Sequence, residues 1–169
     1  GVLEFGLEGE TADYRTVLAE MKETGYEGTE LGDWGFMPTD PAKLRAELDS
    51  YGLEMLGAFV PVALSDRGAH DAGVETGVKT ARLLADAGYP NAKIVLADDN
   101  GTVTARVENA GRVHRGLGLD ADGWRTLREG AKRFAKTVRD ETGLRTAFHH
   151  HCAGFVETLR ALPLEQWER

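Results

Sequence analysis

Three consecutive histidines, His149 to His151, form the most chemically capable segment of this chain. They follow the short segment 146–148 and precede Cys152, so they stand where a buried β-strand is expected to end. Because side chains alternate between the two faces of a strand, His149 and His151 should point the same way and His150 the opposite way. Imidazoles at a strand end can carry protons, bind a metal ion or hydrogen-bond a polyhydroxylated substrate. We therefore predict catalytic roles for His149 and His151, and a packing or hydrogen-bonding role for His150.

Polar and aromatic residues also follow other expected strands. Glu30 could bind a substrate hydroxyl, although a surface or ion-paired glutamate is the alternative. Trp34 lies in a glycine-rich turn, where its ring could cover the apolar face of a sugar or pack in the core. Asp98, Asp99 and Asn100 could hydrogen-bond a substrate, or the aspartates could cap the following turn. These five residues are the predicted substrate-binding set.

Two residues beside the histidines are expected to have ordinary structural roles. Glu157 falls in the first turn of a predicted helix, where a carboxylate interacts favourably with the helix dipole, so its role should be local. Cys152 could be a thiolate ligand or a nucleophile, but a small buried residue is the simpler expectation. As the single cysteine, it excludes an internal disulfide and fits a reducing cytoplasm.

A repeated order of amphipathic helix, glycine and short apolar strand must position these side chains. Four helices are expected, ending near Gly25, Gly52, Gly88 and Gly143, because glycine can adopt the left-handed conformation that closes a helix. The third should present Val74, Val78, Ala81 and Ala85 on one face. A weak fifth helix, over residues 155–167, is interrupted by Pro163. The five expected strands cover residues 2–5, 28–31, 54–60, 93–97 and 145–149.

Strands that alternate with helices of this length predict an α/β fold with a parallel sheet in a single domain, residues 1–169. Five such units could form an open doubly wound sheet, or the first five units of an eight-stranded barrel. Ligands bind at the carboxyl ends of the strands in either architecture. The irregular segment 98–122 is predicted to be an extended active-site loop or a lid.

Composition excludes several classes of function. The net charge is −8 and the basic residues form no stripe, which argues against nucleic acid and anionic membrane surfaces as partners. No apolar run approaches the ~18 residues of a membrane span, and no leader resembles a secretory signal. The chain starts at Gly1, so we expect that its true N-terminus has been cut. The dinucleotide and nucleoside-triphosphate glycine motifs are missing from the turns.

Several segments together resemble the xylose-isomerase-like TIM barrel superfamily of sugar isomerases and epimerases. The nearer resemblance is to its inosose dehydratase branch, in which a triple-histidine strand end is followed by a Glu-Thr pair, here Glu157-Thr158. The resemblance runs from the start of the chain to about Thr158. The segments that carry it are residues 25–35, 59–61, 97–101 and 148–158.

The resemblance implies a closed (β/α)8 TIM barrel, of which this chain supplies about the first five βα units. It also implies a divalent metal, Mn, Co or Mg, bound in the full-length parent by residues on strands five to eight. Many relatives end the fifth strand in Glu-Pro-His, so that His149 falls at the metal-ligating Glu and His151 at the His. The later Asp, His and Glu ligands have no counterparts here, so tight metal binding by this chain alone is not expected.

The resemblance implies a sugar or inositol isomerase or dehydratase, in which a proton is removed next to a carbonyl and a metal stabilises the enediolate. The parent would be a lyase or an isomerase, acting on a small polyol or keto-sugar. This chain alone would be inactive. The alternative is a non-catalytic truncated barrel that serves as a sugar-binding or assembly module. Open barrel edges also predict homo-oligomers.

Overall fold

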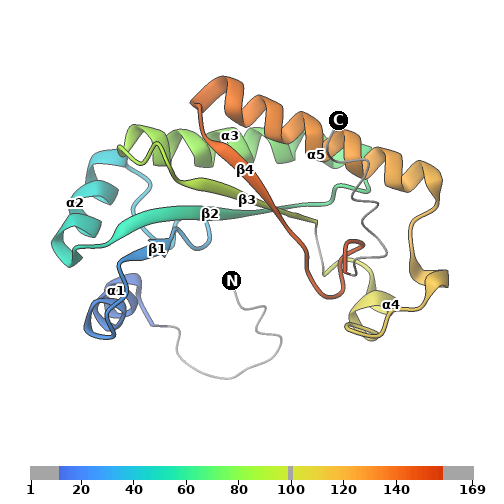
Figure 1. The fold of residues 1–169 in the computed structure, drawn as a ribbon, viewed down its shortest axis with the longest axis horizontal. Helices are drawn as coiled ribbons and strands as arrows, with labels where there is room; N and C mark the ends of the chain where they lie inside the picture. Colours follow the sequence, from blue (N-terminus) through green and yellow to red (C-terminus); the bar gives the residue numbers. More distant parts are fainter. Residues whose placement is uncertain (1–11, 99–100, 158–169) are drawn as a thin grey trace.

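The computed structural model describes residues 12–98 and 101–157 of the chain, which form four strands beside five α-helices (Figure 1). The strands are β1 (Gly28–Glu30), β2 (Glu54–Val62), β3 (Lys93–Asp98) and β4 (Arg145–His149). The helices are α1 (Tyr14–Glu23), α2 (Pro41–Tyr51), α3 (His70–Asp86), α4 (Thr104–Val107) and α5 (Ala121–Thr142). Two short 3₁₀ helices, η1 (Arg67–Ala69) and η2 (Arg115–Leu117), precede α3 and α5.

The four strands form one parallel sheet in the order β1-β2-β3-β4. Each strand pairs with its neighbour in sequence, so the described sheet has no strand reversal of the kind a doubly wound sheet requires. This confirms the predicted sequential order for the strands near 28–31, 54–60, 93–97 and 145–149. The strand predicted at 2–5 lies outside the described residues.

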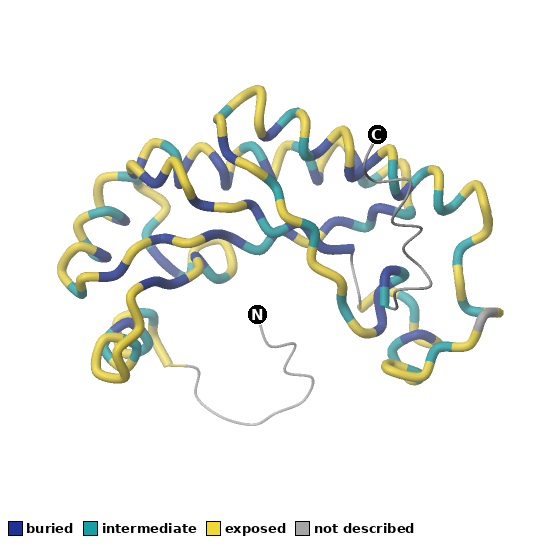
Figure 2. The backbone as a smooth tube through the Cα atoms, in the orientation of Figure 1, coloured by how far each residue is buried: buried dark blue, intermediate teal, exposed yellow. Residues whose placement is uncertain are grey.

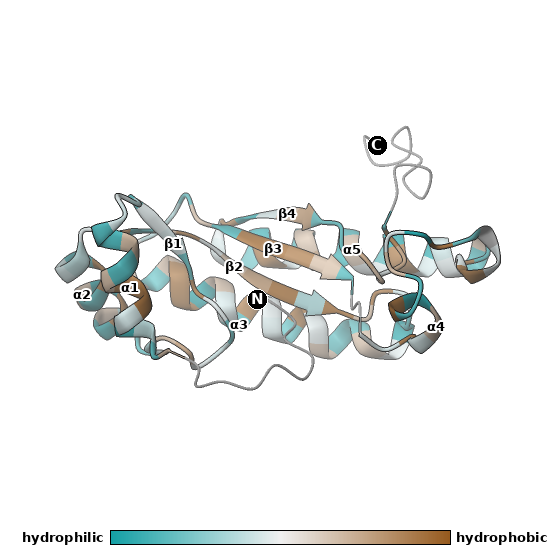
Figure 3. Cartoon of the chain, turned by 90° about the horizontal axis from the view of Figure 1, so that it is seen from below, coloured by the Kyte–Doolittle hydropathy of each residue, from teal (hydrophilic) through white to brown (hydrophobic). Residues whose placement is uncertain are grey.

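Helices α3 and α5 cover one face of the sheet, and the core lies between them and the strands (Figures 1 and 2). Ile94 and Leu96 of β3 are fully buried there, together with Phe134 and Val138 of α5. Figure 3 looks onto the opposite face of the sheet, where the strands lie in front of the helices. Strand alternation places the side chains of Ala147 and His149 on that opposite face.

The helix ends follow the capping rules that predicted them. Asp40 accepts a hydrogen bond from the amide of Lys43, and Pro41 occupies the first turn of α2. Gly143 ends α5 in the left-handed conformation, with φ of 76°. The chain then enters β4 immediately, so this cap sets the direction of the histidine-bearing strand.

Close packing of α3 on α5 depends on a residue without a side chain. Gly77 of α3 lies against the ring of Phe134, and a Cβ atom at position 77 would overlap that ring. The predicted apolar face of this helix is only partly right, because Ala81 is buried while Val74, Val78 and Ala85 are partly buried. The face against α5 includes small residues that a search for hydrophobic periodicity does not detect.

The segment predicted to be an extended loop or lid contains α4 and η2 in its described part and leads into α5. Residues 155–157, where the weak fifth helix was predicted to begin, are not helical, and residues 158–167 lie outside the described part of the chain. Within residues 12–98 and 101–157, no helix is long and apolar enough to cross a membrane.

Candidate active site

The side chains of His149 and His151 lie together at the carboxyl end of β4. Their ring centroids are 4.6 Å apart and the ring planes stand at 81°. Phe59 of β2 contacts both rings edge-on, at centroid distances of 6.4 Å to His149 and 5.6 Å to His151. We call Phe59, His149 and His151 the histidine cluster.

The register of the sheet explains how residues of β2 and β4 meet across the intervening strand. His149 pairs with Ala97 of β3, and Ala97 pairs in turn with Pro61 of β2. The Ala97 side chain is small, so it leaves room above β3 for the ring of Phe59 to approach the imidazoles. The sheet thus brings together residues that are about 90 positions apart in sequence.

His150 and Cys152 are both exposed, which corrects two expectations from the sequence. His150 was predicted to pack or hydrogen-bond on the far face, yet its ring lies 5.9 Å from that of His149. Cys152 was predicted to be a buried small residue. The physical reason is that β4 ends at His149, so strand alternation no longer directs the side chains that follow.

Burial is the main cause that lowers the pKa of the His151 imidazole, and the neighbouring His149 and His150 add to the effect. His151 is half-buried, whereas His149 is exposed. A lowered pKa favours the neutral form of the His151 imidazole. In that state one ring nitrogen can accept a proton.

Asp98 is buried at the end of β3, with 4% of its surface exposed. Its carboxylate accepts hydrogen bonds from the amide of Leu64, at 3.1 Å, and from the amide of Phe155, at 3.0 Å. The carboxylate therefore connects the loop after β2 with the turn after β4. Its direct contact with substrate stays a prediction, and Asp99 and Asn100 lie outside the described residues.

Glu30 and Trp34 lie toward the opposite edge of the described sheet from the histidines. Glu30 ends β1, which is separated from β4 by three strand spacings, or about 14 Å. Trp34 is 41% exposed, and the ammonium nitrogen of Lys79 lies 4.0 Å from its ring centroid. The described sheet does not bring either residue to the histidine cluster, and their binding of substrate stays a prediction.

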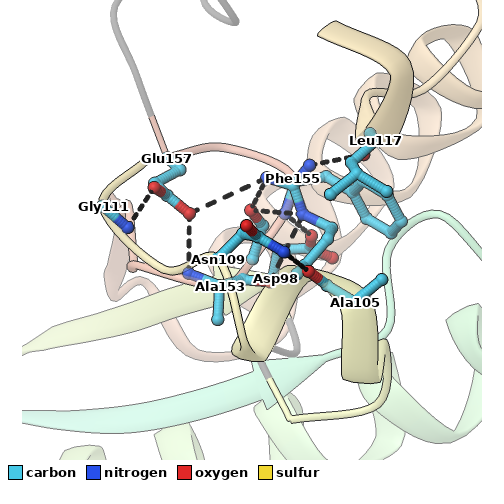
Figure 4. A network of polar contacts seen from close by, with 10 residues as sticks. Asp98, Ala105, Asn109, Gly111, Leu117, Ala153, Phe155 and Glu157 are labelled. Atoms are coloured by element: carbon cyan, nitrogen blue, oxygen red, sulfur yellow. Dashed lines mark hydrogen bonds and ion pairs between the residues drawn. The ribbon is translucent and has the colours of Figure 1, made fainter. Parts of the chain in front are cut away.

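A buried charged network, which the sequence did not reveal, lies beside the turn that follows the histidines (Figure 4). It consists of Asp98, Arg106 and Glu157, and we call it the Arg106 network. The Arg106 side chain, on α4, is 3% exposed and donates to the carbonyl oxygens of Gly154 and Leu117. Burial lowers the pKa of Arg106, while the charges of Glu157 and Asp98 oppose that shift.

Glu157 corrects a further expectation, because its role is not local. Its carboxylate accepts from the amide of Gly111, at 2.6 Å, as well as from the amide of Ala153, at 2.8 Å. The nearest distance between its oxygens and the Arg106 guanidinium is 3.9 Å. No periodic or local signal in the sequence could have paired positions 46 residues apart.

Comparisons with known proteins find sequence relatives named inosose dehydratase and a fold shared with a solved sugar epimerase. The inosose dehydratase of Geobacillus kaustophilus (strain HTA426) is 32% identical over 142 residues, which cover 84% of this chain and 44% of that protein. The rhizopine catabolism protein MocC of Rhizobium meliloti is 36% identical over 145 residues, covering 83% and 41%. The solved 3-keto-D-glucoside 4-epimerase YcjR of E. coli superposes with a TM-score of 0.64 at 16% identity, covering 96% of this chain and 61% of that one.

The chain is a relative of inosose dehydratases and has the fold of sugar epimerases of the xylose-isomerase-like TIM barrel superfamily. It spans about half the length of the curated relatives it matches, so it forms an incomplete barrel of that superfamily. No protein-family profile matches it. In a xylose-isomerase-like barrel the carboxyl ends of the strands form the ligand-binding face, and the histidine cluster lies at that face.

The residues that the structure describes do not complete a metal site of the kind expected for such a barrel. No group of three or more His, Cys, Asp or Glu side chains among them could hold a metal ion. His149 and His151 supply two imidazoles, whereas Mn and Mg prefer several oxygen ligands. A metal in the complete barrel would need ligands in addition to these.

Proposed function

We propose that this chain carries part of the active site of a sugar- or inositol-converting enzyme of the inosose dehydratase type. The observation that carries the proposal is the pair of imidazoles, His149 and His151, 4.6 Å apart at the carboxyl end of β4. The inosose dehydratases among its relatives support the substrate class, a small polyol or keto-sugar. Isomerisation or epimerisation of a keto-sugar is the neighbouring reaction, supported by the epimerase fold.

In the proposed reaction, the neutral imidazole of His151 accepts the proton from the carbon next to the substrate carbonyl. The electron pair of that C–H bond forms the carbon–carbon double bond of an enediolate, and the carbonyl π pair moves to its oxygen. His149 donates a hydrogen bond to that oxygen. In a dehydration, the oxygen pair of the enediolate then re-forms the carbonyl, and the carbon–carbon π pair shifts to the α,β bond as the C–O bond to the β-hydroxyl breaks. The hydroxyl takes the proton from the His151 imidazolium, so that the products are water and an unsaturated ketone.

The proposal gives a divalent metal, Mn, Co or Mg, to the complete protein only, where it would polarise the carbonyl. Among the described residues His149 is the candidate ligand. Two imidazoles do not make a site for these ions, so no step of the reaction is assigned to a metal here.

A second candidate, a non-catalytic sugar-binding or assembly module, is favoured by two observations. The described residues supply no third metal ligand, and the chain spans about half of its curated relatives. In that case the strand ends would bind a polyol without turnover. The free edges of β1 and β4 in the described sheet would then support homo-oligomers. We place either form of the protein in the cytoplasm, in keeping with its single cysteine, Cys152.

Solvent-exchange NMR in D₂O distinguishes the two candidates. The protein encoded by the complete gene is incubated with inosose and with a panel of keto-sugars, with and without Mn. An enzyme will incorporate deuterium next to the carbonyl of at least one compound or convert it to a dehydrated product, and His151→Ala will lose that activity. If substrate binds but neither carbon-bound deuterium nor a new product appears with or without metal, the binding module is correct.

A further inference from the structure

The turn after the histidines has an unusual backbone at Ala153, whose φ is +69°. Ala153 is the one non-glycine residue with positive φ among residues 12–98 and 101–157. A side chain makes this left-handed conformation unfavourable, so it persists only where surrounding contacts hold it. Ala153 lies two positions after His151, so its conformation directs the chain away from the histidine cluster.

Contacts from the Arg106 network hold this turn on both sides of its backbone. The Ala153 amide donates to Glu157 Oε2 at 2.8 Å, and the Ala153 carbonyl accepts from Arg106 Nε at 3.4 Å. The Gly154 carbonyl accepts from both Nε, at 3.1 Å, and Nη2 of Arg106. The Phe155 amide donates to Asp98 at 3.0 Å. Three consecutive residues are therefore fixed by charged side chains.

Arg106 can hold the turn because it is itself fixed by other contacts. Its Nη1 donates to the Leu117 carbonyl at 2.5 Å, and its guanidinium carbon lies 4.8 Å from the ring centroid of Phe155. Glu157 in addition accepts from the Gly111 amide at 2.6 Å. Hydrogen bonds thus join the segment that contains α4 to the turn after β4 in two ways. Arg106 of the first donates to carbonyls of the second, and Glu157 after the turn accepts from an amide of the first.

A buried charge network of this kind is a poor way to gain stability, since well-packed apolar residues often stabilise a fold as much or more. Its distinctive property is directional, because a guanidinium fork fixes the places of the carbonyls that it contacts. We propose that Arg106 and Glu157 are positioning residues, which set the turn at Ala153 and thereby hold His151 beside His149. This proposal rests on the proposed function of the two histidines.

Arg106→Lys and Glu157→Gln, made in the protein encoded by the complete gene, test the positioning role. Lysine keeps the charge but cannot reach three carbonyls with a planar fork, and glutamine offers one acceptor oxygen in place of two. Arg125→Lys is the matched control, because Arg125 pairs with Asp122 on the exposed surface of α5. Two properties are measured: turnover, and the imidazole carbon and proton NMR signals of each histidine.

We expect Arg106→Lys to lower kcat about 10- to 100-fold with KM changed less than about 3-fold, since small misplacements of reacting groups have effects of this size. Glu157→Gln should show a smaller loss. Both variants should shift the His151 ring signals and leave those of the buried His70 in place. Arg125→Lys should resemble the wild type in every measurement.

Unchanged His151 signals in a folded Arg106→Lys protein would overturn the proposal, and so would wild-type kcat. If Arg106→Lys fails to fold, Glu157→Gln decides by the same two criteria. The NMR measurement needs no substrate, so it also separates this proposal from the proposed function. Shifted His151 signals in a protein without turnover on any tested compound would support the positioning role and contradict the proposed function.

Discussion

The imidazole of His70 on α3 lies directly against Gly130 of α5. A Cβ atom at position 130 would come within 2.5 Å of His70 Nε2. That nitrogen is also 2.8 Å from the carbonyl oxygen of Leu64, so the ring cannot turn away without breaking a buried hydrogen bond. His70 at the start of α3 therefore restricts position 130 of α5 to glycine.

Gly130→Ala is expected to reduce the free energy of unfolding by about 2–4 kcal/mol, by overlap with the His70 ring and loss of its hydrogen bond. Helix propensity alone would predict a gain of about 1 kcal/mol for the same change. Urea denaturation monitored by circular dichroism measures the difference. Thr126→Ala on the same helix serves as the control, and a stabilised Gly130→Ala protein would contradict the packing described.

The lowered pKa of His151 predicts a dependence of stability on pH. Because the folded protein holds this proton less tightly than the unfolded chain, whose histidine titrates near 6.5, the unfolded chain takes up the proton first as pH falls. The free energy of unfolding should thus be highest above pH 6.5 and decrease below it, until the pH passes the folded pKa. Urea denaturation at pH 7.5 and 5.5 should show a smaller decrease for His151→Gln than for the wild type. Equal decreases would argue against the shift.

Replacement of each histidine in the triplet should give different results in the complete protein. His149→Ala and His151→Ala are expected to lower turnover about 10²- to 10⁴-fold, the usual effect of a lost acid or base, with little change in fold. His150→Ala should leave turnover close to wild type, and its exposed side chain also predicts a small effect on stability. Steady-state kinetics with matched thermal melts provides the comparison. Near-normal turnover in both the His149→Ala and His151→Ala variants would show that the triplet has a structural role and no catalytic one.

Isothermal titration of the present chain with Mn or Co should show weak binding. The described residues provide two neighbouring imidazoles and no third ligand, so most coordination positions would be left to water. We expect dissociation constants above about 10 μM, and His149→Ala should weaken what binding there is. Tight binding of one Mn per monomer would show that the chain has ligands beyond those described.

The sequence predicted the local features of this fold well, because they depend on neighbouring residues. Caps such as Asp40 and Gly143, together with apolar periodicity, located α1, α2, α3, α5 and the four described strands in their order, whereas α4 lies in the segment predicted to be irregular. Prediction was wrong where strand alternation was extended past the end of β4, as at His150, and where long-range contacts decided the role of a residue, as at Glu157. Arg106 was missed entirely, since a surface arginine and a buried one are identical in sequence. Substrate binding by Glu30, Trp34 and the aspartates stays a prediction.

The Arg106 network also has a consequence for the order in which the molecule assembles. Its hydrogen bonds join positions 57, 48 and 46 residues apart, from Asp98 to Phe155, from Arg106 to Gly154 and from Gly111 to Glu157. Each bond closes a long loop, and such contacts form late because chain entropy opposes them until nearer elements have folded. During synthesis, α3, β3 and α5 can pack before Glu157 has left the ribosome, whereas the turn after the histidines cannot. The histidine pair is therefore expected to be the last part of the described chain to reach its final arrangement.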